Sequence, residues 1–350
     1  MDRIGSAIID FTEAAYDLEV GDEDWLPTIL RRGLPVLEQG LGVAGMRYGR
    51  PPDEGPFQLL DILVASGPED FAERHAAALA TTPPDVLREQ VRPGGAGTAS
   101  MDSQGDSEQL AHYTSHVDYC KDLLYITAVD RKGAGVAIVA PLAEVTTLTE
   151  HEAQRWQMLA AHVDAGHRLR HGLADNDTGG ETHTDLPYDA EAIFDANSFR
   201  MTDAVGQAQE RSATRKLRDA AVAVDRARGK MRDTNPEKAL EIWKALVRGR
   251  WSMVDWFDSD GRRFVLALPN APQVNDPRGL TERESQVVAY AVLGQTNKMI
   301  GYRLGLSKSR VSMLLRSAMR KLGVRTRSQL VIKLRDFQAL QQPAQSEERF

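Results

Sequence analysis

One stretch near the C-terminus, residues 280–334, constrains the fold more than any other part of the sequence. Thr281 and Glu284 have the spacing of a Thr-x-x-Glu capping box, so a helix is predicted to begin directly after Thr281. Gly294 is placed to end that helix, because glycine readily adopts the left-handed conformation common just after a helix. The predicted inward face of this helix consists of Val287, Val288, Ala291 and Val292.

Three more helices are predicted along the same stretch. Thr296 can cap a short second helix that stops near Gly305, and Ser307 can cap a third helix that Gly323 closes. Thr326 is placed to start a fourth helix. Two helices joined by a tight turn that contains glycine predict a helix-turn-helix, here within an all-α four-helix domain.

The charge of this stretch indicates what its outer face meets. Eleven Lys or Arg and no Asp or Glu lie between Ser285 and Arg335. Because the whole chain has a net charge of −7, the remaining residues together carry −18. A basic segment on an acidic protein is the electrostatic footprint of a nucleic-acid-binding module. The alternative, a merely solvated basic helix face, does not explain why the caps, the turn and the charge agree.

The stretch resembles the LuxR-type helix-turn-helix domain of bacterial transcription regulators, over about 55 of the 350 residues. In chain order, the matching residues are Leu280, Thr281, Arg283, Glu284, Gly294, Asn297, Lys298, Ile300, Leu304, Ser307, Val311, Lys321, Leu322, Gly323, Val324, Arg327 and Leu330. Four residues depart from the family's usual choice, namely Gly301 for Ala, Arg310 for Thr, Ser312 for a base-contacting Lys and Leu314 for His. These departures bear on the target sequence rather than on the binding mode.

The third predicted helix is expected to lie in the major groove of DNA, because that groove admits a helix and presents a full base code. The expected base-reading residues are Ser309, Ser312, Met313 and Arg316. For the last three, the resemblance implies contacts with base edges. Arg316 can bind guanine in bidentate fashion, and Met313 can contact a thymine methyl group.

Other side chains of the stretch are expected to position the domain on the duplex, because contacts with phosphate carry no base information. The expected phosphate contacts are Thr296, Asn297, Lys298, Lys308, Arg310, Arg320 and Lys321. The resemblance also implies that the fourth helix forms a dimer contact. Its candidate residues are Gln329, Val331, Ile332 and Phe337, which packing in the core would explain equally well.

Length, cysteine content and the length of the apolar runs limit the classes of protein to which the chain can belong. The 350 residues suggest two or three domains. Cys120 is the only cysteine, so no disulfide can form within the chain, which fits a reducing compartment. The N-terminus lacks a signal-peptide pattern, and no apolar run approaches the ~20 residues that span a bilayer. A cytoplasmic protein without membrane contact is therefore expected.

The first 173 residues are predicted to form an α+β domain. Two helical segments open it, and β-rich runs at 123–129 and 136–140 predict an antiparallel hairpin. A second capping box, formed by Thr149 and Glu152, predicts the start of a long closing helix. The hairpin and the closing helix resemble GAF-type sensor domains.

A second, smaller α+β domain is predicted to follow. Asn235 and Pro236 are placed as the cap and first residue of a helix that ends at Gly249. Runs at 251–257 and 263–268 flank an Asp-Gly pair, which predicts a hairpin with a tight turn. Together these elements resemble a PAS-type domain.

The predicted fold class is thus α+β multidomain, with an all-α domain at the C-terminal end. The predicted organisation is 1–173 GAF-like domain, 174–187 linker, 188–269 PAS-like domain, 270–279 linker, 280–340 helix-turn-helix domain and 341–350 tail.

One set of residues raises the question of a metal site. His112, His116 and Cys120 are spaced four apart, so on one helix they would share a face able to bind a transition metal or a haem-like cofactor. The strand predicted near Leu123 breaks that face. A buried free thiol and two ordinary histidines are therefore the preferred interpretation, and no cofactor is expected.

No catalytic set is recognisable, since the sequence has no G-x-S-x-G, no P-loop and no Cys/His pair with an orienting group. An enzyme is not expected. Three hypotheses remain. The first is a dimeric transcription regulator whose front domains sense a small ligand or partner protein. The second is a sigma-factor-like RNA polymerase subunit, which would share the Leu-Thr-x-Arg-Glu opening. The third is an enzyme or a protein-interaction module in the front half, which the C-terminal domain only tethers to DNA.

The ending Lys-Leu-Gly-Val favours the LuxR type over the sigma-factor type. The partners to expect are double-stranded DNA, a second copy of the chain, RNA polymerase and an unidentified small-molecule or protein effector.

Overall fold

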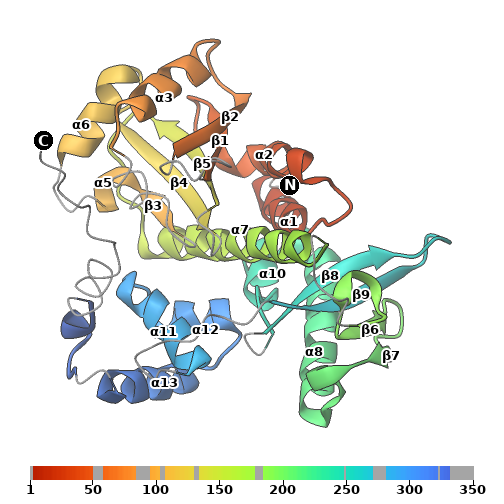
Figure 1. Cartoon of the computed structure of the whole chain (residues 1–350). Helices are drawn as coiled ribbons and strands as arrows, with labels where there is room; N and C mark the ends of the chain where they lie inside the picture. Colours follow the sequence, from red (N-terminus) through yellow and green to blue (C-terminus); the bar gives the residue numbers. More distant parts are fainter. Residues whose placement is uncertain are drawn as a thin grey trace, which may run out of the picture. The chain divides into compact units, whose positions relative to one another are not determined.

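The computed structural model describes residues 3–49, 58–83, 95–102, 107–129, 134–177, 184–247, 250–270, 281–321 and 324–331. The chain divides into two compact units, Met1–Asn270 and Ala271–Phe350 (Figure 1). The first unit contains two antiparallel sheets with helices, which confirms the predicted α+β class. Within the described ranges, no helix has both the length and the apolar character needed to cross a bilayer.

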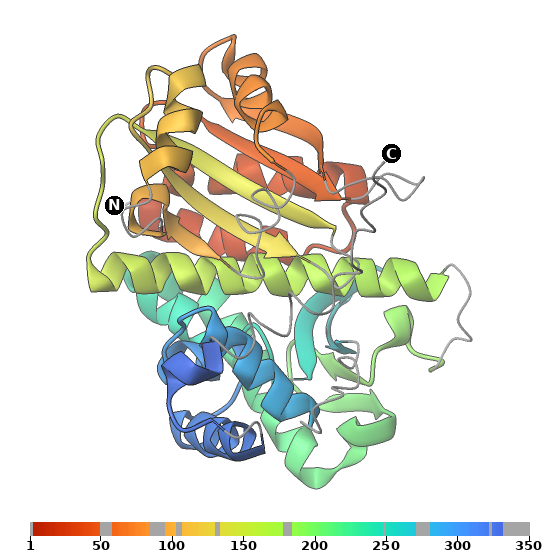
Figure 2. The same cartoon turned by 60° about the vertical axis from the view of Figure 1, so that its left-hand side comes forward.

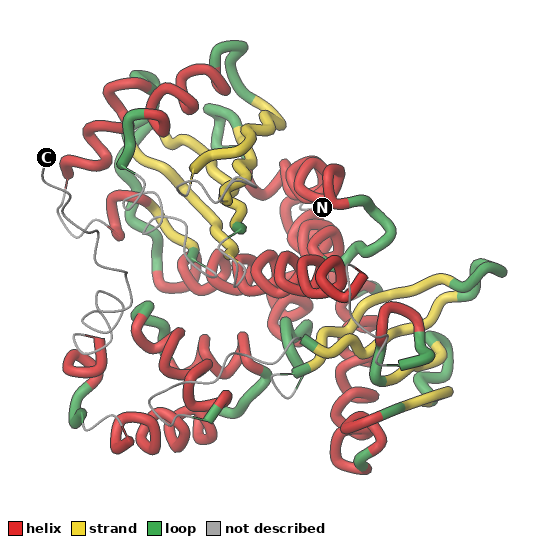
Figure 3. The backbone as a smooth tube through the Cα atoms, in the orientation of Figure 1, coloured by secondary structure: helices red, strands yellow, loops and turns green. Residues whose placement is uncertain are grey.

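The larger sheet has five antiparallel strands in the order β2-β1-β5-β4-β3 (yellow in Figure 3). They are β1 (Val43–Gly49), β2 (Gln58–Ser66), β3 (Ala96–Thr98), β4 (Asp122–Val129) and β5 (Gly135–Leu142). Pairing of β4 with β5 along their whole length confirms the predicted hairpin strands. Every residue of the central strand β5 is buried, so this strand is covered on both sides.

Helices cover both faces of this sheet. They are α1 (Arg3–Ala15), α2 (Asp22–Leu37), α3 (Phe71–Ala80), α5 (Ala99–Asp102), α6 (Ser107–His116) and α7 (Glu150–Asp177). Ala44 and Met46 of β1 pack with Phe71 of α3, whereas Gly45 between them lies against Leu26 of α2. Alternate residues of a strand point to opposite faces, so α2 and α3 lie on opposite sides of the sheet.

Helix α7 packs against α1, β3 and β4 and runs along the sheet (Figure 2). Its start is the predicted capping box, because Thr149 N donates to Glu152 Oε2 at 2.8 Å and Glu152 N donates to Thr149 Oγ1 at 3.3 Å. The helix continues to Asp177, within the segment that the sequence suggested as a linker.

The smaller sheet has four antiparallel strands in the order β7-β6-β9-β8. The elements of this module are η1 (Pro187–Asp189), β6 (Ala192–Asp195), β7 (Met201–Ala204), η2 (Gly206–Gln209), α8 (Arg211–Arg228), α9 (Met231–Thr234), α10 (Pro236–Ile242), β8 (Trp251–Phe257) and β9 (Arg263–Pro269). Pairing of β8 with β9 confirms the predicted hairpin. Whether the two modules belong to the GAF and PAS types remains a hypothesis.

The helix predicted from Asn235 is shorter than its sequence suggested. Asn235 caps it and Pro236 occupies its first position, as predicted. The predicted end at Gly249 is wrong, because the helix stops at Ile242. The next residue, Trp243, is fully buried on extended backbone, so its tertiary contacts override the local helical preference.

Helix α1 joins the two sheet modules into one unit. Tyr16, which follows it directly, hydrogen-bonds through its hydroxyl to His162 Nδ1 of α7 at 2.9 Å and stacks on Trp243 with ring centroids 6.0 Å apart. Burial raises the pKa of the Tyr16 hydroxyl well above its usual value. Arg228 of α8 approaches Glu13 of α1 to 3.1 Å. The two modules therefore share buried contacts along α1.

The approach of α7 to α1 at Gly166 gives a testable prediction. A Cβ at this glycine would lie 2.0 Å from the backbone oxygen of Ala15, whereas a Cβ at Gly172 on the same helix would have no atom within 4 Å. Gly166→Ala should lower the free energy of unfolding by about 1–3 kcal/mol. Gly172→Ala should leave it unchanged or raise it by up to about 1 kcal/mol, because alanine favours the helix.

Urea unfolding followed by tryptophan fluorescence measures this effect in the first unit, because all five tryptophans lie there. Equal midpoints for the two variants would contradict the predicted close contact.

Candidate nucleic-acid interface

The second unit consists of helices around one apolar core (Figure 1). They are α11 (Glu282–Val292), α12 (Asn297–Leu304), α13 (Lys308–Lys321) and a helical segment at 327–331. The core side chains are Val287, Val288, Ala291, Ile300, Leu304, Val311, Leu314, Leu315, Ala318 and Leu330. They come from all four helices, so one side of α13 faces inward and the opposite side faces solvent.

Hydrogen bonds at the helix starts confirm the predicted caps of the first three helices. Thr281 N donates to Glu284 Oε2 at 2.8 Å, and Thr281 Oγ1 accepts from Glu284 N at 3.3 Å, which completes the capping box. Thr296 Oγ1 accepts from the backbone N–H three residues later at 3.3 Å. Ser307 Oγ does the same at 3.2 Å. Each cap satisfies backbone donors that a helix start leaves unpaired.

The turn between α12 and α13 is closed by its glycines. Gly305 ends α12 in the left-handed conformation, with φ +62°. Leu306 N donates to Gly301 O at 2.8 Å and Gly305 N to Tyr302 O at 3.4 Å, the two hydrogen bonds of a Schellman motif. A Cβ at Gly301 would lie 2.6 Å from Leu306 O. Glycine at this position, where the resembled family usually has alanine, therefore fits the close approach of the turn.

The outward side of α13 is basic and contains one apolar side chain. Its exposed residues are Lys308, Ser309, Arg310, Met313, Arg316 and Arg320. Met313 is 43% exposed, so its apolar side chain is accessible from the solvent side of the helix. Arg316 Nε donates to Ser312 O at 3.3 Å, so its guanidinium lies along the helix surface. Three of the four base-reading candidates, Ser309, Met313 and Arg316, thus share one solvent-facing side.

The fourth base-reading candidate has a partner within the domain. Ser312 is half-buried, and its Oγ accepts a hydrogen bond from Asn297 Nδ2 at 3.0 Å. Asn297, an expected phosphate contact, therefore links the start of α12 to the middle of α13. The other expected phosphate contacts at this end, Thr296 and Lys298, are exposed. The side chain of Lys321 lies outside the part that the structure describes.

Arg327 has a structural role that the sequence did not show beyond its match to the family. Its guanidinium donates to Ala291 O at 3.2 and 3.1 Å and also to Gln295 O, at the C-terminal end of α11. Burial lowers the pKa of Arg327. This side chain satisfies carbonyls that a helix end leaves unpaired and holds the fourth helical segment against α11.

The candidate dimer residues divide into described and undescribed positions. Gln329 Oε1 accepts from Arg325 N at 2.9 Å and from Thr326 N at 3.2 Å, while Thr326 Oγ1 accepts from Gln329 N at 3.1 Å. Gln329 thus completes a capping box for the last helix. Val331 is half-buried. Ile332 and Phe337 lie outside the described residues, so their part in a dimer stays a prediction.

The three candidate metal ligands do not converge. His112 and His116 lie together on α6 with ring centroids 5.1 Å apart. Cys120 lies beyond the end of that helix, is 2% exposed, and donates from Sγ to Asp122 O at 2.9 Å. Burial raises the pKa of its thiol. In the part of the chain that is described, no three His, Cys, Asp or Glu side chains form a group that could hold a metal ion.

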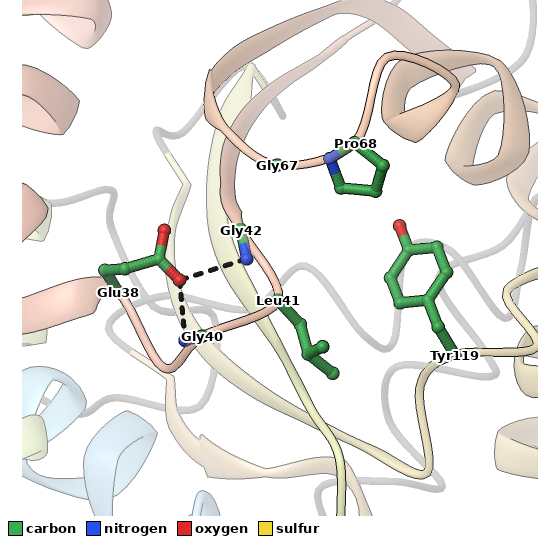
Figure 4. Close-up of a pocket in the computed structure, with 7 residues that line it drawn as sticks. All are labelled: Glu38, Gly40, Leu41, Gly42, Gly67, Pro68 and Tyr119. Carbon is green, nitrogen blue, oxygen red and sulfur yellow. Dashed lines mark hydrogen bonds between the residues drawn. The ribbon is translucent and has the colours of Figure 1, made fainter.

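An open hollow lies in the first unit where the chain enters β1 and leaves β2 (Figure 4). Its volume is about 460 Å³, and it is lined by Glu38, Gly40, Leu41, Gly42, Gly67, Pro68 and Tyr119. Glu38 Oε1 accepts from Gly40 N at 2.7 Å and Gly42 N at 3.0 Å, and its other oxygen accepts from Ser66 Oγ. Although partial burial acts in the opposite direction, these hydrogen bonds lower the pKa of Glu38.

Glu38 was not among the residues that the sequence predicted to be functional. The pattern near it in the sequence that could have pointed to this loop is the Gly-x-Gly of residues 40–42. The carboxylate holds the loop that forms one side of the hollow.

A capped four-helix core with an outward basic helix defines a helix-turn-helix DNA-binding domain. Residues 278–334 match the family described as bacterial regulatory proteins, luxR family. Residues 278–334 therefore form a luxR-family DNA-binding domain, which is the kind of domain that transcription regulators contain. No curated protein matches the chain.

Arg327 and Arg325 provide a matched pair of substitutions. Arg327→Gln should destabilise the end of α11 by about 1–3 kcal/mol, because it removes charged hydrogen bonds to buried carbonyls. Arg325→Gln should change stability by less than about 0.5 kcal/mol, because the Arg325 side chain is exposed. Amide hydrogen exchange in the full chain measures the effect of each substitution on the stability of α11. Equal exchange in α11 for the two variants would show that Arg327 does not hold the helix end.

Proposed function

We propose that this chain is a sequence-specific regulator that places α13 in the major groove of double-stranded DNA. The observation that carries this proposal is the exposed face of α13, which is basic and rests on a buried, fully capped helical core. No Asp or Glu lies between Ser285 and Arg335 to oppose a polyanion. The match to the luxR family supports the same binding mode.

The base-reading set that we propose is Ser309, Ser312, Met313 and Arg316. Arg316 is suited to guanine, whose O6 and N7 accept two hydrogen bonds from one guanidinium. Met313 is suited to a thymine methyl group, because it is apolar and exposed on the same side. Ser312 differs from the others, because its hydroxyl already accepts from Asn297 and can reach a base only as part of that pair.

Phosphate contacts would position this helix without reading bases. The proposed set is Thr296, Asn297, Lys298, Lys308, Arg310, Arg320 and Lys321. We also propose that two copies bind together through the last helix, with Gln329, Val331, Ile332 and Phe337 as the candidate contact. A contact with RNA polymerase belongs to the same proposal, since a transcription regulator acts on polymerase at a promoter.

For the first unit, we propose a sensory role toward a small ligand or a partner protein. Two α+β modules, joined by buried contacts around Tyr16, precede the DNA-binding domain, and the sequence offers no catalytic set. A ligand can alter the DNA-binding domain only if it binds two arrangements of the protein with different affinity.

Selection of genomic DNA fragments by the purified full chain, with and without cell extract, tests both the specific DNA binding and the sensory role of the first unit. Enrichment of a shared sequence supports specific binding, and a change with extract supports an effector. Absence of any salt-sensitive affinity for duplex DNA would falsify the DNA-binding proposal itself.

Arg316 and Lys308 separate base reading from phosphate contact. Arg316→Ala should cost about 1–3 kcal/mol on the selected site and relax specificity at one base position. Lys308→Ala should weaken binding to all sequences alike and reduce the salt slope of binding by about 1. Titration of each variant with the selected site and with single-base variants of it measures both effects. Uniform weakening by Arg316→Ala would instead make Arg316 a phosphate contact.

A further inference from the structure

Helix α8 of the first unit presents a row of arginines to solvent. Its buried side is apolar and consists of Ala213, Leu217, Ala221, Val224 and Ala227. On the opposite side Arg211, Arg215, Arg218 and Arg226 follow one another at helical spacing and are all exposed. At 1.5 Å per residue this row, which we name the α8 arginine row, is about 22 Å long. Val222 lies within it and is 41% exposed.

The α8 arginine row differs from the arginines that follow it. Arg228 is paired with Glu13 at 3.1 Å and with Asp255, and Arg232 is paired with Asp10. These two side chains hold α8 and α9 against other elements of the unit. Asp219 lines the same shallow hollow as Arg211, Arg215 and Arg218, but within the described residues no ion pair of 4 Å or less joins a member of the α8 arginine row to an acidic side chain. Their charges are available to a partner.

Stability of α8 does not explain this arrangement. The first eight residues of the helix, 211–218, contain three Arg, one Lys and no acidic residue, whereas Asp219 and Asp225 come later. A helix macrodipole favours the reverse order, with acidic side chains at the N-terminal end. The preceding Glu210 makes no side-chain cap hydrogen bond either. The cationic first half of α8 is therefore unfavourable for the isolated helix, and a bound anion would offset this cost.

A nucleic-acid backbone fits this row better than a compact acidic ligand does. Arginine side chains spread along about 22 Å match a long, regular array of charge, and duplex DNA presents one phosphate charge per about 1.7 Å of axis. Arginine also binds phosphate in bidentate geometry. Outside residues 285–335 the chain sums to −18, so a basic row in this acidic unit is a local feature rather than part of a general positive charge.

The length of the connecting chain limits how far the first unit can lie from the DNA that α13 would bind. Ten residues, 271–280, lie between Asn270 and Thr281. Fully extended, such a segment spans at most about 35 Å. One turn of B-DNA is about 34–36 Å long. DNA that flanks the base pairs read by α13 is therefore within reach of the first unit.

We propose that the α8 arginine row is a second, sequence-independent DNA contact that binds the phosphate backbone beside the base pairs read by α13. This inference rests on the proposed DNA-binding function and extends its footprint beyond the luxR-family domain. It also implies that the first unit contributes directly to the affinity of the chain for DNA.

A matched pair of double variants tests the contact in the full chain. Arg215→Gln/Arg218→Gln removes two charges from the row. Arg31→Gln/Arg200→Gln removes two charges from exposed arginines elsewhere in the first unit. Glutamine is a good helix former, so α8 should remain folded, and circular dichroism checks this. Binding is measured by fluorescence anisotropy over a series of salt concentrations. The DNA ligands are random-sequence duplexes of about 16 and about 40 base pairs, which correspond to about one and a half and about four turns at 10–10.5 base pairs per turn.

On the longer duplex, the α8 double variant should bind at least several-fold more weakly than the parent, with a salt slope reduced by about 1–2. On the shorter duplex it should match the parent. Arg215→Lys/Arg218→Lys should keep the salt slope, because the charge remains. The Arg31/Arg200 double variant should not weaken binding to either duplex by a comparable amount.

Several results would overturn the contact. One is an unchanged salt slope of DNA binding in the α8 double variant. Another is an equal loss of affinity for the longer duplex in the Arg31/Arg200 double variant. A third is an altered oligomeric state in sedimentation with unchanged DNA affinity, which would assign the row to a second copy of the chain. Lys308→Ala serves as the internal reference. If it weakens binding while the α8 double variant does not, only the α8 contact fails. If the parent chain binds neither duplex, the proposed function fails with it.

Discussion

Burial of α1 against helices from both sheet modules is the constraint on which the first unit depends. The helix contacts α2 and α7 of the module with the larger sheet and α9 and α10 of the module with the smaller sheet, and Tyr16 directly after it is buried. Burial raises the pKa of Glu13 despite the nearby Arg228 and Arg232. The ion pairs here therefore act against a desolvation cost, and they join α8 and α9 to α1.

Arginine has two distinct uses in this molecule. Arg327 and Arg303 lie inside the DNA-binding domain, the first bonded to helix-end carbonyls and the second with its guanidinium 5.4 Å from the Tyr290 ring centroid. Arg316 on α13 and the α8 arginine row face solvent instead. Because an arginine keeps its charge in either setting, the enclosed ones interact with carbonyls or an aromatic ring of the domain, whereas the exposed ones remain available for phosphate or bases. Sequence alone does not separate these two groups.

The sequence predicted those features that depend on neighbours along the chain. Caps at Thr281, Thr296 and Ser307 join residues three apart, so their patterns can be read directly. The same reasoning predicted where α10 begins, but its end at Ile242 depends on the burial of Trp243, which no local pattern shows. For the candidate site, the outward side of α13 followed from helical spacing. The Asn297–Ser312 and Arg327 contacts join separate helices and left no signal in the sequence.

The hydrogen bond between Asn297 and Ser312 has a consequence for how such a protein acquires new targets. A larger or charged residue at 312, such as the lysine common in the resembled family, would lose the short hydroxyl that accepts from Asn297. The amide would then turn to another acceptor, such as water or a DNA phosphate, because it is only half-buried. The residue at 312 therefore decides whether the Asn297 side chain bonds within the domain or is available to the duplex.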